Sequence, residues 1–221
     1  NIGIGKDAGT NLTTGDNIIA LGKEALSSMT TTGSTVGIGY QAGKTNTKSH
    51  SVFIGYTAGR DTSTGGDNVV IGSQALRQNT TGQQNVAIGR STMLNSTSSG
   101  NTAIGHNALF TQTTASGNTA MGASAMSNLA SSGYSNTAIG SAAGQQLTSG
   151  YNNTFVGTGA QPSSASVNNE ITIGNADVTS LNYMPKVSDE NNSTVALENK
   201  LQDLFDNASK KIQDGGKKRG R

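Results

Sequence analysis

The stretch Asn101-Thr102-Ala103-Ile104-Gly105 is the unit from which most of this chain is built. It returns almost unchanged at residues 118–122 and 136–140, and looser copies begin as early as Asn1. A short period that holds over most of a chain predicts stacked repeats. The copies end at eleven glycines, 16 to 18 residues apart, which we expect to form turns: Gly5, Gly22, Gly39, Gly55, Gly72, Gly89, Gly105, Gly122, Gly140, Gly157 and Gly174.

Within each copy, the residues alternate between two kinds of side chain. The middle residue is small in most copies, as at Ala103, whereas the residue three places before the glycine is mostly β-branched. Side chains alternate across a strand and β-branched residues favour strands, so each copy predicts a short β-strand. The residue directly before the glycine is always large and aliphatic, and these residues form a predicted apolar spine: Ile4, Leu21, Ile38, Ile54, Ile71, Ile88, Ile104, Met121, Ile139, Val156 and Ile173.

The rest of each repeat predicts a corner, a second short segment and a polar turn. An alanine stands three residues after the glycine in nine of the eleven copies. Polar stretches such as Thr80-Thr81-Gly82 then lead to the next copy, and these are residues typical of turns. Coils stacked at about 4.8 Å would make a rod of about 50 Å. We therefore expect residues 1–174 to form an all-β shaft of eleven repeats.

The composition indicates how so polar a chain can still fold. Among 221 residues, 13% are charged, the net charge is +2, and Leu, Ile, Val and Phe together number 39. This apolar content lies below the roughly 20% that normally accompanies a packed core, yet disorder also requires a high net charge. A few apolar residues repeated at the same place would form one continuous spine, so we expect one elongated domain.

A single chain of this kind has few large side chains in each repeat. We expect a lone chain to be a flat ribbon that exposes an alanine and glycine face, and three ribbons around one axis would cover their apolar stripes. The sequence therefore favours a homotrimer, although a wider solenoid made by one chain remains open. Because the chain opens inside a repeat, at Asn1 and without a Met, we also expect a piece of a longer protein.

The repeats stop after Gly174. Residues 175–181 read as a last strand, and Pro185 interrupts the pattern shortly afterwards. We place a junction, or neck, at residues 175–192.

A helical pattern follows the junction. It covers residues 193–214, with Ser193 as its N-cap, and residues 215–221 form a basic tail that we expect to be disordered. Phe205 and Ile212 offer a competing apolar stripe, so the register of the helix stays open. A short coiled coil would use the predicted seam Leu197, Leu201, Leu204 and Ala208.

Charged residues are too sparse for most enzyme sites. No Asp, Glu, Lys or Arg occurs from Ser91 to Asn169, where His106 stands alone, and a single histidine is neither an acid–base pair nor a ligand set. His50 lies in a polar turn. The segment Gly39–Thr45 has three residues between its glycines where a phosphate-binding loop needs four. We therefore predict no catalytic, cofactor-binding or metal-binding residue.

The same reasoning limits the partners. The chain has no cysteine for disulfide or thiol chemistry, and no stretch approaches the roughly 20 apolar residues of a membrane span. Basic residues are spread thinly except at the end of the chain, so we expect neither nucleic-acid binding nor membrane insertion. Four tyrosines next to turns could stack on sugar rings or pack between chains: Tyr40, Tyr56, Tyr134 and Tyr151.

The Asn-Thr-Ala-Ile-Gly unit, the Ala-Gly or Ala-Leu pairs after it and the 17-residue period resemble two related groups of fibrous proteins. One is the left-handed β-roll head of trimeric autotransporter adhesins, and the other is the repeat shaft of bacteriophage tail fibres and tailspikes. Residues 170–181 are similar to the junction that ends the repeats of such phage fibres before a self-cleaving chaperone. We find no counterpart here of that chaperone or of the adhesins' membrane anchor, and the missing anchor favours the phage fibre.

The resemblance implies a homotrimeric, left-handed parallel β-roll that serves as a non-enzymatic spacer of a phage tail and contributes to host attachment. Its expected place is the virion, and its expected partners are two further copies, other tail or fibre proteins, and a glycan or protein receptor on the host surface. One alternative is a bacterial adhesin head at the cell surface. Another is a single-chain ice- or glycan-binding solenoid that uses a row of threonines: Thr102, Thr119, Thr137 and Thr154.

Overall fold

The structure is a computed structural model, and it describes residues 1–31, 33–130 and 132–178. Several predictions concern later residues and lie outside the described part of the chain. They are the junction beyond residue 178, the helix at 193–214 with its seam Leu197, Leu201, Leu204 and Ala208, and the tail at 215–221.

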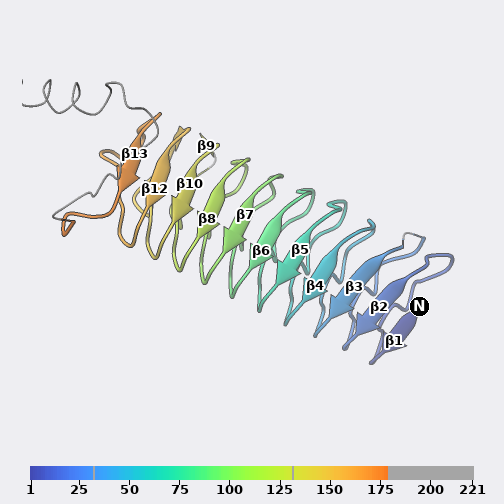
Figure 1. The fold of residues 1–221 in the computed structure, drawn as a ribbon. Coiled ribbons are helices and arrows are strands. Elements are labelled where there is room, and N and C mark those ends of the chain that lie inside the picture. Colours follow the sequence, from blue (N-terminus) through green and yellow to red (C-terminus); the bar gives the residue numbers. More distant parts are fainter. Residues whose placement is uncertain (32, 131, 179–221) are drawn as a thin grey trace, which may run out of the picture. The chain divides into compact units, whose positions relative to one another are not determined.

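Eleven parallel strands form one sheet in the order in which they occur along the chain, so each coil lies beside the next (Figure 1). The register pairs equivalent positions of neighbouring repeats, as where Ile104 lies beside Met121. The prediction of an all-β parallel solenoid with coils of about 17 residues is therefore confirmed. The strands are β1 (Ile2–Ile4), β2 (Ile18–Leu21), β3 (Thr35–Ile38), β4 (Val52–Ile54), β5 (Val69–Ile71), β6 (Val86–Ile88), β7 (Thr102–Ile104), β8 (Thr119–Met121), β10 (Thr137–Ile139), β12 (Thr154–Val156) and β13 (Ile171–Ile173).

A second, smaller sheet lies in the later coils. It pairs β9 (Gly133–Tyr134) with β11 (Gly150–Tyr151) in parallel, and each of these strands shortly precedes a strand of the main sheet. The coil that contains β9 runs from Gly122 to Gly140 and is 18 residues long. The described part of the chain contains no helix with the length and apolarity that a membrane crossing needs.

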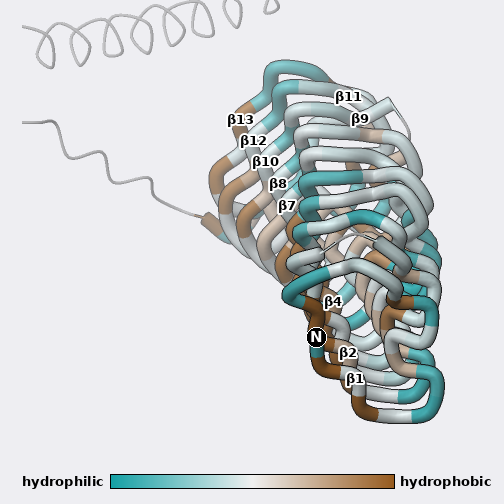
Figure 2. Tube along the Cα trace, turned by 90° about the vertical axis from the view of Figure 1, so that its right-hand side faces the viewer, coloured by the Kyte–Doolittle hydropathy of each residue, from teal (hydrophilic) through white to brown (hydrophobic). Residues whose placement is uncertain are grey.

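The interior of the coil is lined by the small face of each strand. The central strand residues Ala103 and Ala120 have no exposed surface, and neither does Ala108, three residues after a turn glycine. The expectation of a flat ribbon with an exposed alanine and glycine face is therefore wrong. After each strand the chain turns back and closes a coil, so that the small residues of the strand lie inside it (Figure 2). One chain therefore encloses the interior of each coil by itself.

Large side chains fill this interior from a second position, four residues after the turn glycine. Leu109 stands there and is fully buried. At Gly43 and Gly144, where the position holds glycine, a phenylalanine takes the space: a Cβ added to Gly43 would lie 2.6 Å from the ring of Phe53, and one added to Gly144 would lie 2.8 Å from the ring of Phe155. A large residue at the centre of a strand thus compensates for a glycine at the fourth residue after a turn, and the core stays densely packed.

The turn glycines have a conformation and a position that require them. Gly105 has a φ of 135°, and a Cβ added to it would lie 2.5 Å from the carbonyl oxygen of Gly122 in the next coil. A side chain at this place would be strained and would push neighbouring coils apart. All eleven of these glycines have positive φ.

The described chain ends in a turn. The N–H of Val178 donates to the carbonyl of Asn175 at 3.2 Å, and the N–H of Asp177 donates to Oδ1 of Asn175 at 3.1 Å. The prediction of a last strand from residue 175 is therefore wrong for residues 175–178. The asparagine side chain satisfies backbone groups that a strand would pair with a neighbour, which favours a turn.

Candidate functional site

The outward side of the main sheet, which we call the outer face, is the candidate functional site. In β2 to β8, β10 and β12, the residue two places before the turn glycine points into the coil, and the residues on either side of it point outward. The residues just before the turn glycines form the closing row, which is the predicted spine, and Figure 2 shows apolar residues along this side. The residues two places earlier form the opening row: Ile2, Ile19, Val36, Val52, Val69, Val86, Thr102, Thr119, Thr137, Thr154 and Ile171.

The structure thus places the spine outside a single coil. Ile104 is partly buried, while Met121, Ile139 and Val156 are 40%, 43% and 37% exposed. The register places each of these side chains beside its equivalents in the next coils, so they form a continuous strip. Large contiguous apolar surfaces of this kind mark interaction sites.

The outer face changes in composition along the sheet. From β1 to β6 both rows are aliphatic, whereas in β7, β8, β10 and β12 the opening row is threonine beside an aliphatic closing row. Neither row contains a charged residue. The surface is therefore suited to apolar contact along its whole length, with hydroxyl groups available in its later part.

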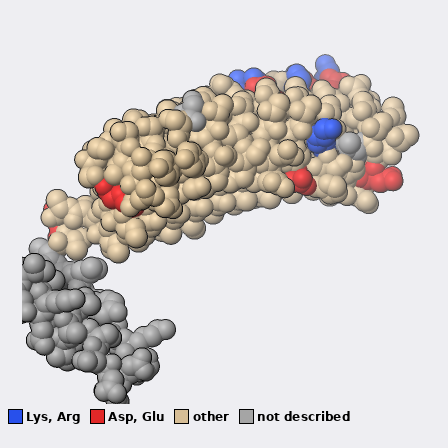
Figure 3. Space-filling view, turned by 90° about the horizontal axis from the view of Figure 1, so that it is seen from above, with Lys and Arg blue, Asp and Glu red and all other residues tan. Residues whose placement is uncertain are grey.

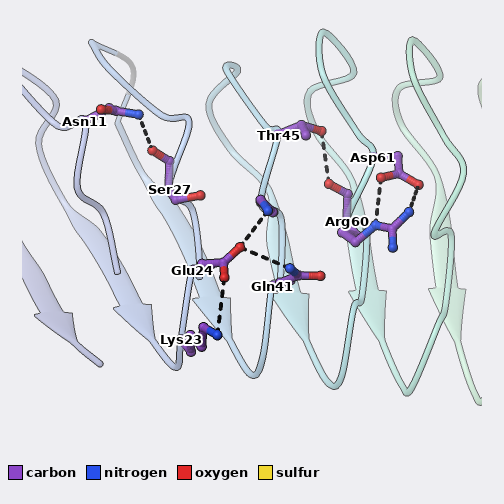
Figure 4. Close-up of polar contacts among 9 residues, drawn as sticks. Asn11, Lys23, Glu24, Ser27, Gln41, Thr45, Arg60 and Asp61 are labelled. Carbon is purple, nitrogen blue, oxygen red and sulfur yellow. Dashed lines mark hydrogen bonds and ion pairs between the residues drawn. The ribbon is translucent and has the colours of Figure 1, made fainter. Parts of the chain in front are cut away.

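Charged side chains gather over the early coils instead (Figure 3). Lys44 Nζ lies 2.5 Å from Glu24 Oε2, and Lys23 Nζ lies 3.7 Å from Glu24 Oε1 (Figure 4). Arg60 and Asp61 form a second pair, with Nε 2.8 Å from Oδ1. Of these contacts, the one between Lys44 and Glu24 joins neighbouring coils, and none of the charged residues belongs to the two rows of the outer face.

The pKa values of these groups follow their contacts. The hydrogen bond from Lys44, with another from Gln41, lowers the pKa of Glu24 below its ordinary value. The hydrogen bond to Asp61 raises the pKa of Arg60. Both groups are therefore charged at neutral pH, and neither is poised to donate or accept a proton there.

The residues considered for chemistry lie apart from one another. His106 is exposed, and the Nδ1 atom of exposed His50 lies 3.8 Å from Oδ1 of Asp67. Gly39 and Gly43 have positive φ at a coil corner, and no helix follows them. Within residues 1–31, 33–130 and 132–178, no three His, Cys, Asp or Glu residues lie close enough to hold a metal ion.

A ladder of buried asparagines is a feature that the sequence pattern did not reveal. Oδ1 of Asn118 accepts the backbone N–H of Asn136 at 2.9 Å, and Nδ2 of Asn118 donates to the carbonyl of Gly133 at 3.0 Å. Each side chain thereby ties its own strand to the following coil. The ladder consists of Asn68, Asn85, Asn101, Asn118, Asn136 and Asn153, all essentially without exposed surface. The recurring Asn before most strands was visible in the sequence, but its inward direction was not.

The four tyrosines form two stacked pairs. The rings of Tyr40 and Tyr56 have centroids 5.3 Å apart, with Lys23 Nζ 5.9 Å from the Tyr40 centroid. The rings of Tyr134 and Tyr151 are 5.0 Å apart and nearly parallel. The first pair lies among the charged groups, whereas the second lies on β9 and β11, in the part of the chain that has no charged residue.

The arrangement as a whole offers surfaces for binding and no clustered groups for catalysis among the described residues. Its distinctive elements are the outer face, the asparagine ladder and the two tyrosine pairs. Comparison of the chain with protein-family models, with curated proteins and with solved structures found no match.

Proposed function

We propose that this chain is a non-enzymatic segment of a homotrimeric fibre, in which the outer faces of three coils meet around a common axis. The observation that carries the proposal is the uncharged, largely aliphatic outer face, which runs over all eleven strands. Removing apolar surface from water contributes about 25 cal/mol per Å². A small contribution repeated in every coil therefore sums to a strong driving force for association.

The occupant that fits this surface is another copy of the same chain. The surface repeats once per coil, at about 4.8 Å, and only a partner with the same repeat can match it over its full length. With two outward side chains from each strand, the face provides a number of residues comparable with the roughly 20–30 per side of a stable interface.

The later strands, in which the two rows differ in composition, support three chains around an axis. In a trimer, one row faces the axis while the other packs against a neighbouring chain, so the two rows have different surroundings. The threonines of the opening row in β7, β8, β10 and β12 are suited to the less apolar of these places. In a face-to-face dimer, both rows would meet a single partner.

The biological role that we propose is a stiff spacer in a phage tail, which holds a host-recognition element away from the particle and contributes to attachment. The resemblance of the repeat to phage fibre shafts supports this role and a left-handed coil. A continuous ladder of backbone hydrogen bonds between coils provides the stiffness, as from the N–H of Gly105 to the carbonyl of Ile88 at 2.7 Å.

The test is a charge placed on the outer face. Ile104→Asp would bury an unpaired carboxylate at the contact between chains, and we expect a folded monomer in place of a trimer. Asn128→Asp adds the same charge at an exposed residue and should remain trimeric. Sedimentation of both variants measures the outcome. A trimer of Ile104→Asp as stable as that of Asn128→Asp would contradict the proposed packing.

The threonine row favours a second candidate function, that of a single-chain binding solenoid. Thr102, Thr119, Thr137 and Thr154 lie in register on the outer face and are partly exposed in one chain. A flat array of hydroxyl and methyl groups could bind ice or a glycan. A monomer in sedimentation together with thermal hysteresis in solution would favour this function over the fibre.

A further inference from the structure

We infer that the second sheet, β9 with β11, carries a binding site for an uncharged oligosaccharide. The site consists of the stacked pair Tyr134 and Tyr151 and the neighbouring amide pair Asn152 and Asn169. The inference deepens the proposed role in attachment and rests on it for its biological meaning. The binding site itself is a property of one coil surface and does not require the trimer.

The tyrosine pair provides an exposed aromatic surface. Tyr134 is 48% exposed and Tyr151 is 37% exposed, although their rings stack with centroids 5.0 Å apart and planes 6° apart. In the preceding coil, exposed Ser116 lies beside the residue that follows Tyr134, because the carbonyl of Ser116 accepts the N–H of Ser135. An exposed aromatic ring with a polar tip can pack against the C–H groups of a sugar.

The amide pair lies at the next residue along the chain and provides polar groups. Nδ2 of Asn152 donates to Oδ1 of Asn169 at 2.9 Å, and both side chains are exposed. This contact orients the two amides and uses one donor and one acceptor. Oδ1 of Asn152 and the amide hydrogens of Asn169 then point to a ligand or to water, and they match sugar hydroxyls as acceptor and donors.

The surroundings select an uncharged ligand. No Asp, Glu, Lys or Arg occurs from Ser91 to Asn169. Next to the patch in sequence, Glu170 has its carboxylate held by the hydroxyls of Ser163 and Thr172, and the bond from Ser163 lowers its pKa. Without a cationic partner, an anionic sugar would gain no ion pair here. The Tyr40 and Tyr56 pair lacks this neutrality, because Lys23 and Arg60 lie close to it.

The position of the patch fits a role in attachment. Figure 2 shows β9 and β11 on a different side of the coil from the strands of the main sheet. A trimer that buries the outer face would therefore leave the tyrosine pair accessible. The longest coil, of 18 residues, also occurs here, between Gly122 and Gly140, so the repeat departs from its usual length at the same place.

The test is binding of the full chain to an array of uncharged and acidic oligosaccharides, followed by titration calorimetry with the best uncharged one. We expect an uncharged oligosaccharide to bind. Tyr134→Ala/Tyr151→Ala should weaken this binding by at least roughly tenfold, the loss typical of aromatic anchors. The matched control Tyr40→Ala/Tyr56→Ala removes the other stacked pair and should bind like the unaltered chain.

Asn152→Ala/Asn169→Ala keeps the rings and removes the amides, so it should weaken binding even if the tyrosine variant fails to fold. Binding of no uncharged oligosaccharide would overturn the inference, and so would equal losses in the two tyrosine variants or no loss in the asparagine variant. Because sedimentation measures the trimer separately, a trimer that binds no sugar would overturn the glycan site alone, whereas a monomer that binds sugar would overturn the fibre alone.

Discussion

The two sides of each short strand follow different rules. In β7, Ala103 points into the coil and has no exposed surface, while Thr102 and Ile104 on either side of it point outward and keep partial exposure. The inward position is small because Leu109 and its equivalents occupy the same interior from another part of the coil. The outward positions are larger and more apolar than the surface of a lone chain requires.

This difference separates folding from assembly. The interior of each coil is complete within one chain, because buried alanine, leucine, methionine and phenylalanine residues form one connected core. The outer face adds nothing to that core, yet it repeats an aliphatic residue in every coil. Inward substitutions should therefore act on the fold, and outward substitutions should act on the contact between chains.

The largest expected effect comes from a charge on the inward side. Ala120→Asp would place an unpaired carboxylate in the coil interior, which costs several kcal/mol. This cost is a large part of the free energy of unfolding of a typical domain, about 5–15 kcal/mol. We expect loss of the β signal in circular dichroism and rapid proteolysis. The adjacent outward variant Thr119→Asp should keep its β signal, and loss of folding in both would remove the distinction between the two faces.

A smaller but still large effect is expected where the coils approach most closely. Gly105→Ala would place a Cβ against the backbone of Gly122 at a φ of 135°, and we expect a loss of about 2–4 kcal/mol. Gly100→Ala is the control, since that glycine has a φ of 70° and nothing within 4 Å of an added Cβ. It should cost about 1–2 kcal/mol. Chemical denaturation measures both, and equal losses would contradict a role for the close approach.

The asparagine ladder should contribute a moderate amount. Asn118→Ala leaves the N–H of Asn136 and the carbonyl of Gly133 without their partner, which costs about 1–3 kcal/mol for buried groups. Asn128→Ala, at an exposed position, should change the stability by less than about 0.5 kcal/mol. If the midpoint of denaturation of Asn118→Ala matched that of this control, the asparagine ladder would not contribute to the stability of the fold.

The smallest effect should depend on pH. Since its contacts lower the pKa of Glu24 in the folded chain, the carboxylate stabilises the fold above its ordinary pKa of 4.5, and this contribution is lost as the pH falls through the lowered value. Glu24→Gln should therefore lower the melting temperature slightly at pH 7 and have no effect near pH 2. A difference that persists at pH 2 would assign the effect to something other than the ion pair with Lys44.

The sequence predicted the strands and turns of this fold well, because the signals are local and repeat. A β-branched residue, a small residue, an aliphatic residue and a glycine in succession suffice to place each strand and corner. The second copy shows the limit: Asn17 stands directly before β2, as asparagines do before most strands, but Ile18 occupies the ladder position and Asn17 has a φ of 58°.

The sequence could not decide which side of the strand faces inward. Alternation defines two faces, and composition alone favours burial of the more apolar one, which is the predicted spine. The small face is buried instead, because large side chains from another part of the coil pack against it. These residues include Leu109 and Met126, which adopt positive φ values of 51° and 45° that large residues seldom adopt. Burial of these side chains offsets the strain of their backbone. Local sequence propensity does not predict this conformation, because it depends on packing within the coil.

The candidate site was visible in the sequence only in part. The uncharged later repeats and the four tyrosines stand out in the sequence. Their stacking depends on register between coils, which brings Tyr134 beside Tyr151 through β9 and β11. The extra residue that makes one coil 18 residues long can be counted in the sequence, but the small sheet between that coil and the next cannot be predicted from this length.

The central claim is that the outer faces of several copies meet, and the mass of the unaltered chain in native buffer tests it most directly. Sedimentation equilibrium over a range of concentrations should give a species of three times the chain mass of 22.4 kDa. A single species of 22.4 kDa at every concentration would contradict the account, because the outer face would then be exposed to water along its whole length.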